Sequence, residues 1–122
     1  MAATHYDTES RPYRGSVAAH GLVFLSGRLG MRDGVLPEGV PEQTLQAVRN
    51  VESELAAQGL TLADLVKVTV FLDDMADYDT MNSAYLQAMP TPLPARTCIG
   101  VDALPYGGLV EIEVVAARQA PE

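Results

Sequence analysis

Two residues in the last third of the chain, Arg96 and Glu111, carry side chains suited to binding an anion and to moving a proton. A guanidinium can bind a carboxylate through two parallel hydrogen bonds, and a glutamate can take a proton from water and return it. The residues around each alternate between two faces, so we expect both on β-strands, with Glu113 beside Glu111. On neighbouring strands, the pair is either an exposed ion pair contributing about 0–1 kcal/mol or an anion-binding and proton-transfer site. The pairing by itself favours the ion pair.

The surrounding sequence indicates neither a covalent nucleophile nor a metal site. Cys98 shares the expected strand face with Arg96, and a lone cysteine is more often a small buried apolar residue than a nucleophile. One cysteine and two distant histidines, His5 and His20, exclude cysteine-based zinc clusters. The acidic run at 73–79 lacks the glycine and the distal glutamate of a calcium loop, so we expect no metal.

The composition is that of one acidic globular domain. The chain has 122 residues, 48% of them hydrophobic and 20% charged, with a formal net charge of −8. A surface this negative repels nucleic-acid phosphates and anionic lipid, so we expect neither nucleic acid nor a membrane as a partner. No apolar run approaches the roughly 18 residues of a membrane span, and the polar start resembles neither a secretory signal nor a transit peptide. We therefore expect a soluble cytoplasmic protein.

The apolar pattern predicts a sheet with two helices. It predicts a hairpin at 16–26 turning at His20-Gly21, a short strand and loop at 28–41, helices at 42–58 and about 75–88, and strands at 65–72, 95–101 and 109–117. The methionines and tyrosines of the second helix recur at helical spacing, which predicts that they belong to the core. Two helices cover only one face of a sheet, so the other face needs a partner and we expect a homo-oligomer.

Short motifs follow one another in a specific order from residue 12 to 117. They are Pro12-Tyr13, the segment 22–27 ending in Ser26-Gly27, Glu42-Gln43-Thr44 with Asn50, the strand 66–72, Met81-Asn82 with Tyr85, the segment 94–98, Leu104-Pro105 and the segment 110–113. Each motif alone is weak. Together they resemble the Rid family of reactive intermediate deaminases, also called the RidA/YjgF family. The resemblance implies one Rid-type domain at 12–118, with tails at 1–11 and 119–122.

This resemblance implies an α+β, chorismate-mutase-like (YjgF-like) fold with two helices packed on one face of the sheet. It implies a homotrimer with its sites at the subunit interfaces, in agreement with the one-sided sheet expected above. It also implies hydrolysis of enamines and imines derived from amino acids, of the 2-aminoacrylate and 2-iminopropanoate type, to 2-keto acids and ammonia. The deaminase of this family needs no cofactor.

The resemblance also assigns roles to residues. It implies that Arg96 binds the substrate carboxylate and that Glu111 activates the attacking water, which makes these two the catalytic residues and reverses the preference for an ion pair. The further substrate-binding positions are Cys98, Tyr13, Ser26 and Asn82. Imines are intrinsically reactive, so positioning and one acid–base group are sufficient, and neither a metal nor a covalent nucleophile is required.

Five residues depart from the family pattern: Arg11, Arg14, Arg28, Gly100 and Tyr106. The first two stand before and after Pro-Tyr, where the family has glycine and a small residue. Arg28 stands where glutamine is common, and the last two replace a frequent glutamate and lysine. These departures indicate a divergent subfamily and leave its preferred substrate open.

Two other functions fit the same residues. The first is a non-enzymatic trimer that binds 2-keto acids or related carboxylates at Arg96. Glu111 favours the enzyme instead, because a pure carboxylate binder gains nothing from a nearby negative charge. The second is a chorismate-mutase-type rearrangement, which rests on fold analogy alone and needs several cations around a dianion, of which this chain offers few.

Overall fold

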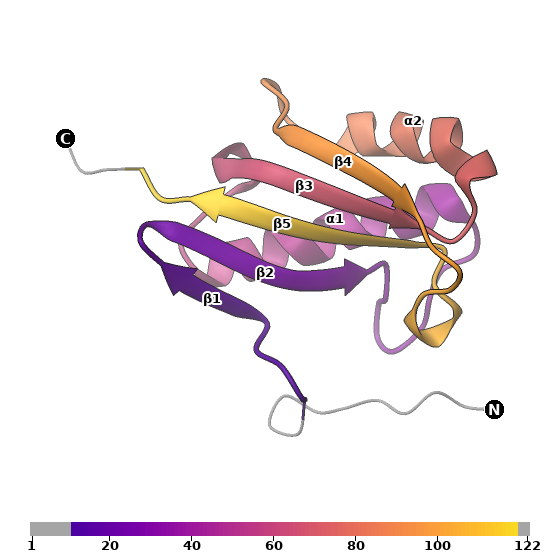
Figure 1. The fold of residues 1–122 in the computed structure, drawn as a ribbon, viewed down its shortest axis with the longest axis horizontal. Coiled ribbons are helices and arrows are strands. Elements are labelled where there is room, and N and C mark those ends of the chain that lie inside the picture. The colour runs from indigo at the N-terminus through magenta and orange to yellow at the C-terminus, as the bar shows by residue number, and fades with distance from the viewer. Residues whose placement is uncertain (1–10, 120–122) are drawn as a thin grey trace.

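The computed structural model describes residues 11–119 and shows a five-stranded sheet with both helices on one face (Figure 1). The strand order is β1-β2-β5-β3-β4, in which β3 and β4 pair in parallel and the other neighbours pair antiparallel. The predicted α+β class with one-sided helices is confirmed. The predicted tails lie outside the described residues, apart from Arg11 and Gln119.

The predicted helices and strands are confirmed with small shifts at their ends. The strands are β1 (Ser16–Ala19), β2 (Leu22–Leu29), β3 (Leu65–Leu72), β4 (Ala95–Gly100) and β5 (Val110–Ala117), and the helices are α1 (Val40–Ala57) and α2 (Tyr78–Ala88). The separate strand expected within 28–41 is wrong. The chain there makes one isolated bridge, Arg32 to Val35, because Asp33 and Gly34 turn it back at positive φ.

The β1–β2 hairpin turns where the sequence predicts it. His20 and Gly21 have φ values of 54° and 79°, and two successive positive values are what a tight two-residue hairpin turn requires. The turn fixes the antiparallel pairing of β1 with β2, and β2 pairs antiparallel with β5 along its other edge.

The core lies between the sheet and the helices. Its largest fully buried side chains include Val23, Val68, Val70, Leu72, Val110, Ile112 and Val114 from the sheet, Val51 and Leu55 from α1, and Met81 from α2. The prediction that all methionines and tyrosines of the second helix are core is wrong for Met75 and Tyr78, which are 45% and 38% exposed. Met75 lies in a separate 3-10 turn before α2, where the Asp74 carboxylate accepts a hydrogen bond from the Ala76 N–H.

The opposite face of the sheet has no helix over it (Figure 1). It presents large apolar side chains, among them Val17, Phe24 and Ile99, whose exposed fractions are 37%, 45% and 43%. Apolar surface gathered on one face is typical of a protein–protein interface. Within residues 11–119, neither helix is both long and apolar enough to cross a bilayer.

Candidate functional site

Arg96 lies on the helix side of β4, where α2 holds its guanidinium. In the sheet, residue Arg96 of β4 stands beside Val68 of β3, which is fully buried under the helices. The guanidinium carbon is 4.9 Å from the centre of the Tyr85 ring and 5.8 Å from that of Tyr78. Nη2 donates a hydrogen bond to Tyr78 Oη at 3.3 Å, and Nη1 lies 3.9 Å from Met81 Sδ. Aromatic faces attract a guanidinium, so these contacts fix its orientation.

A hollow of about 260 Å³ beside Arg96 contains two further polar groups, those of Asn82 and Tyr85. Asn82 Oδ1 and Tyr85 Oη are buried and have no hydrogen-bond partner in the described part of the chain. Burial raises the pKa of Tyr85 more than the Arg96 charge lowers it, so the hydroxyl keeps its proton at neutral pH. Buried polar atoms normally find partners, so these two are unsatisfied groups in residues that line the hollow.

Cys98 lies on the same face as Arg96, as predicted, and packs partly buried against the core. Burial raises the pKa of its thiol more than the Arg96 charge lowers it, which favours the thiol over the nucleophilic thiolate. Farther along β4, a Cβ at Gly100 would lie 2.6 Å from Met75 Cγ. Glycine at position 100 therefore leaves space for the Met75 side chain, which a glutamate at this position would displace.

Glu111 lies on the helix-free side of β5, opposite Phe71. Its carboxylate lies close over Gly27, where a Cβ would be 2.5 Å from Oε1 and 2.9 Å from Cδ, so a side chain at residue 27 would shift the carboxylate. Burial raises the pKa of Glu111 above its ordinary value, and the Glu113 charge adds to this. Among residues 11–119 no cation lies within ion-pair distance of Glu111. A half-buried carboxyl without a counter-ion is suited to general base catalysis.

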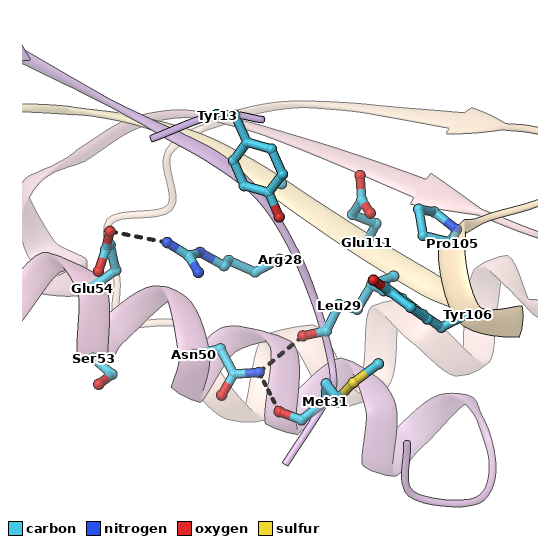
Figure 2. Close-up of a pocket in the computed structure, with 11 residues that line it drawn as sticks. Tyr13, Arg28, Leu29, Met31, Asn50, Ser53, Glu54, Pro105, Tyr106 and Glu111 are labelled. Carbon is cyan, nitrogen blue, oxygen red and sulfur yellow. Dashed lines mark hydrogen bonds and ion pairs between the residues drawn. The ribbon is translucent and has the colours of Figure 1, made fainter. Parts of the chain in front are cut away.

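Glu111 faces a pocket of about 430 Å³ beside the second half of β2 (Figure 2). Its polar wall includes Tyr13, Arg28, Asn50, Glu54, Tyr106 and Glu111. The part of the chain that the structure describes has no group of three side chains able to hold a metal ion.

Ser26 stabilises one wall of this pocket through the backbone of the preceding segment. Its hydroxyl donates a hydrogen bond to the Arg14 carbonyl at 2.7 Å, and its N–H donates to the Gly15 carbonyl at 2.9 Å. These bonds fix the segment that carries Tyr13. The structure therefore gives Ser26 a positioning contact at the place where the sequence predicts substrate binding.

The six predicted site residues form two separate groups. Arg96, Cys98 and Asn82 gather between β4 and α2, and Tyr13, Ser26 and Glu111 gather beside β2. The structure brings members of each group together and does not bring the two groups together within one chain.

The expectation that Arg96 and Glu111 lie on neighbouring strands is wrong. β3 lies between β4 and β5, so their strands are separated by two spacings of about 4.8 Å each. Glu111 is level with Ile99 across the sheet, three residues farther along β4 than Arg96, and the two side chains point to opposite faces. A cross-strand ion pair within one chain is excluded. A site that uses both residues must take them from two copies.

Sequence reasoning missed two features of these sites. The ion pair between Arg28 and Glu54 lies in the Glu111 pocket, with Nη2 and Oε1 3.0 Å apart. Tyr78 holds Arg96 rather than joining the core. The seven-residue spacing of Tyr78 and Tyr85 puts both on one face of α2, which is the signal that could have shown an aromatic surface for Arg96.

Comparison with known proteins supports the motif pattern along the chain. The profile of a family described as "Endoribonuclease L-PSP" matches residues 7–118. The solved structure of the YjgF gene product of E. coli matches with a TM-score of 0.83 and 32% identity, covering 88% of this chain and 89% of that chain. The chain belongs to the RidA/YjgF family. The resemblance and the YjgF-like fold are thereby confirmed.

Other relatives within the RidA/YjgF family carry more specific names. A Bos taurus protein named 2-iminobutanoate/2-iminopropanoate deaminase is 39% identical over 110 residues, covering 88% of this chain and 80% of the relative. The mitochondrial protein mmf2 of Schizosaccharomyces pombe is 39% identical over 111 residues, covering 88% of each chain. The structure of E. coli TdcF with bound serine matches with a TM-score of 0.84 and 33% identity, covering 89% of this chain and 90% of that chain.

Proposed function

We propose that the protein is a hydrolytic deaminase of enamine and imine intermediates derived from amino acids, of the 2-iminopropanoate type. The observation that carries this proposal is the half-buried Glu111 carboxyl, which faces the pocket, has no ion-pair partner among the described residues and has a raised pKa. Relatives named imine deaminases at 38–39% identity support the reaction type.

In this reaction Arg96 binds the substrate carboxylate through its planar fork, whose orientation the α2 tyrosines fix. Glu111 takes a proton from a water molecule as the water oxygen attacks the imine carbon. The protonated carboxyl then returns the proton to the substrate nitrogen to give a carbinolamine. Glu111 takes the proton of the carbinolamine hydroxyl and gives it to the nitrogen as the C–N bond breaks and the keto C=O forms. One water is consumed, and a 2-keto acid and ammonia are released. The Glu111 carboxylate is regenerated, as a general acid–base catalyst requires.

We infer further that the chain assembles as a homotrimer with a site between adjacent protomers. Arg96 and Glu111 point to opposite faces of one sheet, so a shared site takes Arg96 from one protomer and Glu111 from the next. The apolar helix-free face, with Val17, Phe24 and Ile99, supplies surface for such an assembly.

A non-enzymatic trimer that binds 2-keto acids in the same cleft is the second candidate. The TdcF structure, which holds serine, favours small amino-acid-like ligands for this fold. Glu111 favours the enzyme, because its charge opposes a bound carboxylate and is useful only for proton transfer. RNA cleavage, named in the family description, is disfavoured because a net charge of −8 repels phosphates.

The two candidates differ in one assay. Threonine dehydratase or an L-amino-acid oxidase generates free imine, and semicarbazide traps what remains. A deaminase at catalytic concentration lowers semicarbazone formation, whereas a binding protein lowers it only when its concentration approaches that of the imine. Semicarbazone formation unchanged by catalytic amounts of protein would reject the deaminase.

A further inference from the structure

The pocket beside Glu111 extends past the Glu111 carboxyl to a second polar group. Its volume in the single chain is about 430 Å³, and the side chain of 2-iminopropanoate is only a methyl group. Figure 2 shows Glu111 on one side of the pocket and the Arg28–Glu54 pair on the other. With the substrate carboxylate at Arg96 and the imine carbon at Glu111, the substrate side chain is the part left to occupy the Arg28 side.

The Arg28–Glu54 pair is built into the fold. Its side chains are only 21% and 27% exposed, and Nη2 lies 3.0 Å from Oε1. The same nitrogen is 3.4 Å from the Gly15 carbonyl oxygen. A Cβ at residue 15 would lie 2.8 Å from Nη2, so the chain passes this close to the pair because residue 15 is glycine. Contacts with Glu54 of α1 and with the backbone at Gly15, just before β1, therefore fix the position of the guanidinium.

The pair leaves hydrogen-bonding groups of both kinds without a partner among the described residues. Nη2 makes the Arg28 contacts that the structure records, while Nε is buried without a partner and Nη1 has none among the described residues. Glu54 uses Oε1 for the pair, which leaves Oε2 as an acceptor. A guanidinium only donates and a carboxylate only accepts, so the pair offers Nη1 of Arg28 as a donor and Oε2 of Glu54 as an acceptor.

We propose that the lobe of the pocket lined by Arg28 and Glu54 selects imino acids whose side chain ends in a carboxamide, such as the imine formed from glutamine. The inference rests on the proposed deaminase function and specifies its substrate class. A carboxamide presents an acceptor oxygen to Arg28 Nη1 and a donor N–H to Glu54 in one plane. A carboxylate in its place meets the negative charges of Glu54 and Glu111, and an apolar side chain desolvates Arg28 and Glu54 without pairing them.

The test compares kcat/KM for imines that an L-amino-acid oxidase forms from glutamine, glutamate and leucine, with semicarbazide as the trap. We expect the full-length wild type to prefer the glutamine imine to the leucine imine by about tenfold or more, because a site built to hydrogen-bond rejects an analogue without those groups. Arg28→Met should bring this ratio close to one. Glu54→Gln should raise activity on the glutamate imine relative to the glutamine imine. Arg32→Met is the matched control, since Arg32 lines a different hollow, and should leave the ratio as in wild type.

A glutamine-to-leucine ratio unchanged by Arg28→Met, in a variant with a wild-type thermal melt, would overturn the inference. If Arg28→Met does not fold, Arg28→Lys retains the charge beside Glu54 without the planar fork, and the same criterion applies to it. Failure of the proposed function looks different, because the wild type then turns over none of the three imines. Calorimetric titration with 2-oxoglutaramate and 4-methyl-2-oxopentanoate then tests the selectivity of the lobe independently of turnover. Tighter binding of the carboxamide acid that Arg28→Met abolishes supports the lobe, and equal affinities reject it.

Discussion

Replacing Glu111 by glutamine separates proton transfer from binding. Glutamine keeps the shape of the side chain and most of its hydrogen bonding but cannot accept the proton of the attacking water. We expect kcat to fall by about 10²–10⁴, the usual contribution of a positioned general base, which corresponds to about 3–5 kcal/mol in the barrier. The affinity for a 2-keto acid should hold or increase, because the neutral side chain no longer repels the ligand carboxylate.

The same substitution should stabilise the fold at neutral pH. Burial and Glu113 raise the pKa of Glu111 in the folded protein, so the folded state holds this proton more tightly than the unfolded state. The free energy of unfolding therefore declines as pH rises from the unfolded pKa through the folded pKa, and stays lowered above it. Glu111→Gln removes this penalty. Its Tm should exceed that of wild type at neutral pH, and the difference should shrink in acid, where the carboxyl is protonated in both states.

Three measurements test this reasoning about Glu111. The semicarbazide assay gives kcat, calorimetric titration with 2-oxobutanoate gives Kd, and thermal melts give Tm. The wild-type rate should rise with pH through the raised pKa of Glu111, and Glu113→Gln, the matched control, should retain turnover while this rise moves to lower pH. Wild-type turnover in Glu111→Gln would refute the base. Loss of Tm and of ligand affinity together, with turnover retained, would show a structural role instead.

Three further predictions concern the other site residues and the assembly. Arg96→Ala should abolish deaminase activity and weaken 2-keto acid binding in titration while the oligomer persists. Arg96→Lys should restore activity only partly, because an ammonium lacks the planar fork. Full activity in Arg96→Ala would reject the role of Arg96. Cys98→Ser should keep most activity, and a covalent adduct on Cys98 seen by mass spectrometry during turnover would contradict this. Light scattering should give a trimer of about 39 kDa, three times the 13.0 kDa chain, and a stable, active monomer would contradict the assembly.

Local patterns predict most of the fold because they act over a few residues. The alternation at 65–72 specifies β3, and His20-Gly21 specifies the hairpin turn. Strand order is different, since it depends on pairing between distant segments. Period two tells which residues of one strand share a face, yet not which strands are neighbours or whether two strands turn their polar faces the same way. The error about Arg96 and Glu111 has this origin.

The site is predictable in its residue types and only partly in its geometry. Arg28 stands out in the sequence as a departure, but its partner Glu54 lies on α1, and their contact depends on the packing of β2 against that helix. It also depends on Gly15, whose missing side chain leaves the room. Such contacts arise from tertiary packing, so no short-range pattern reports them.

A mixed trimer tests the proposed site between two copies most directly. Arg96→Ala and Glu111→Gln chains, each nearly inactive alone, are co-expressed with different tags, and trimers carrying both tags are purified. If each site takes Arg96 from one protomer and Glu111 from the next, every such trimer contains one complete site out of three, and we expect about one third of wild-type activity. Mixed trimers that regain no activity would contradict the account.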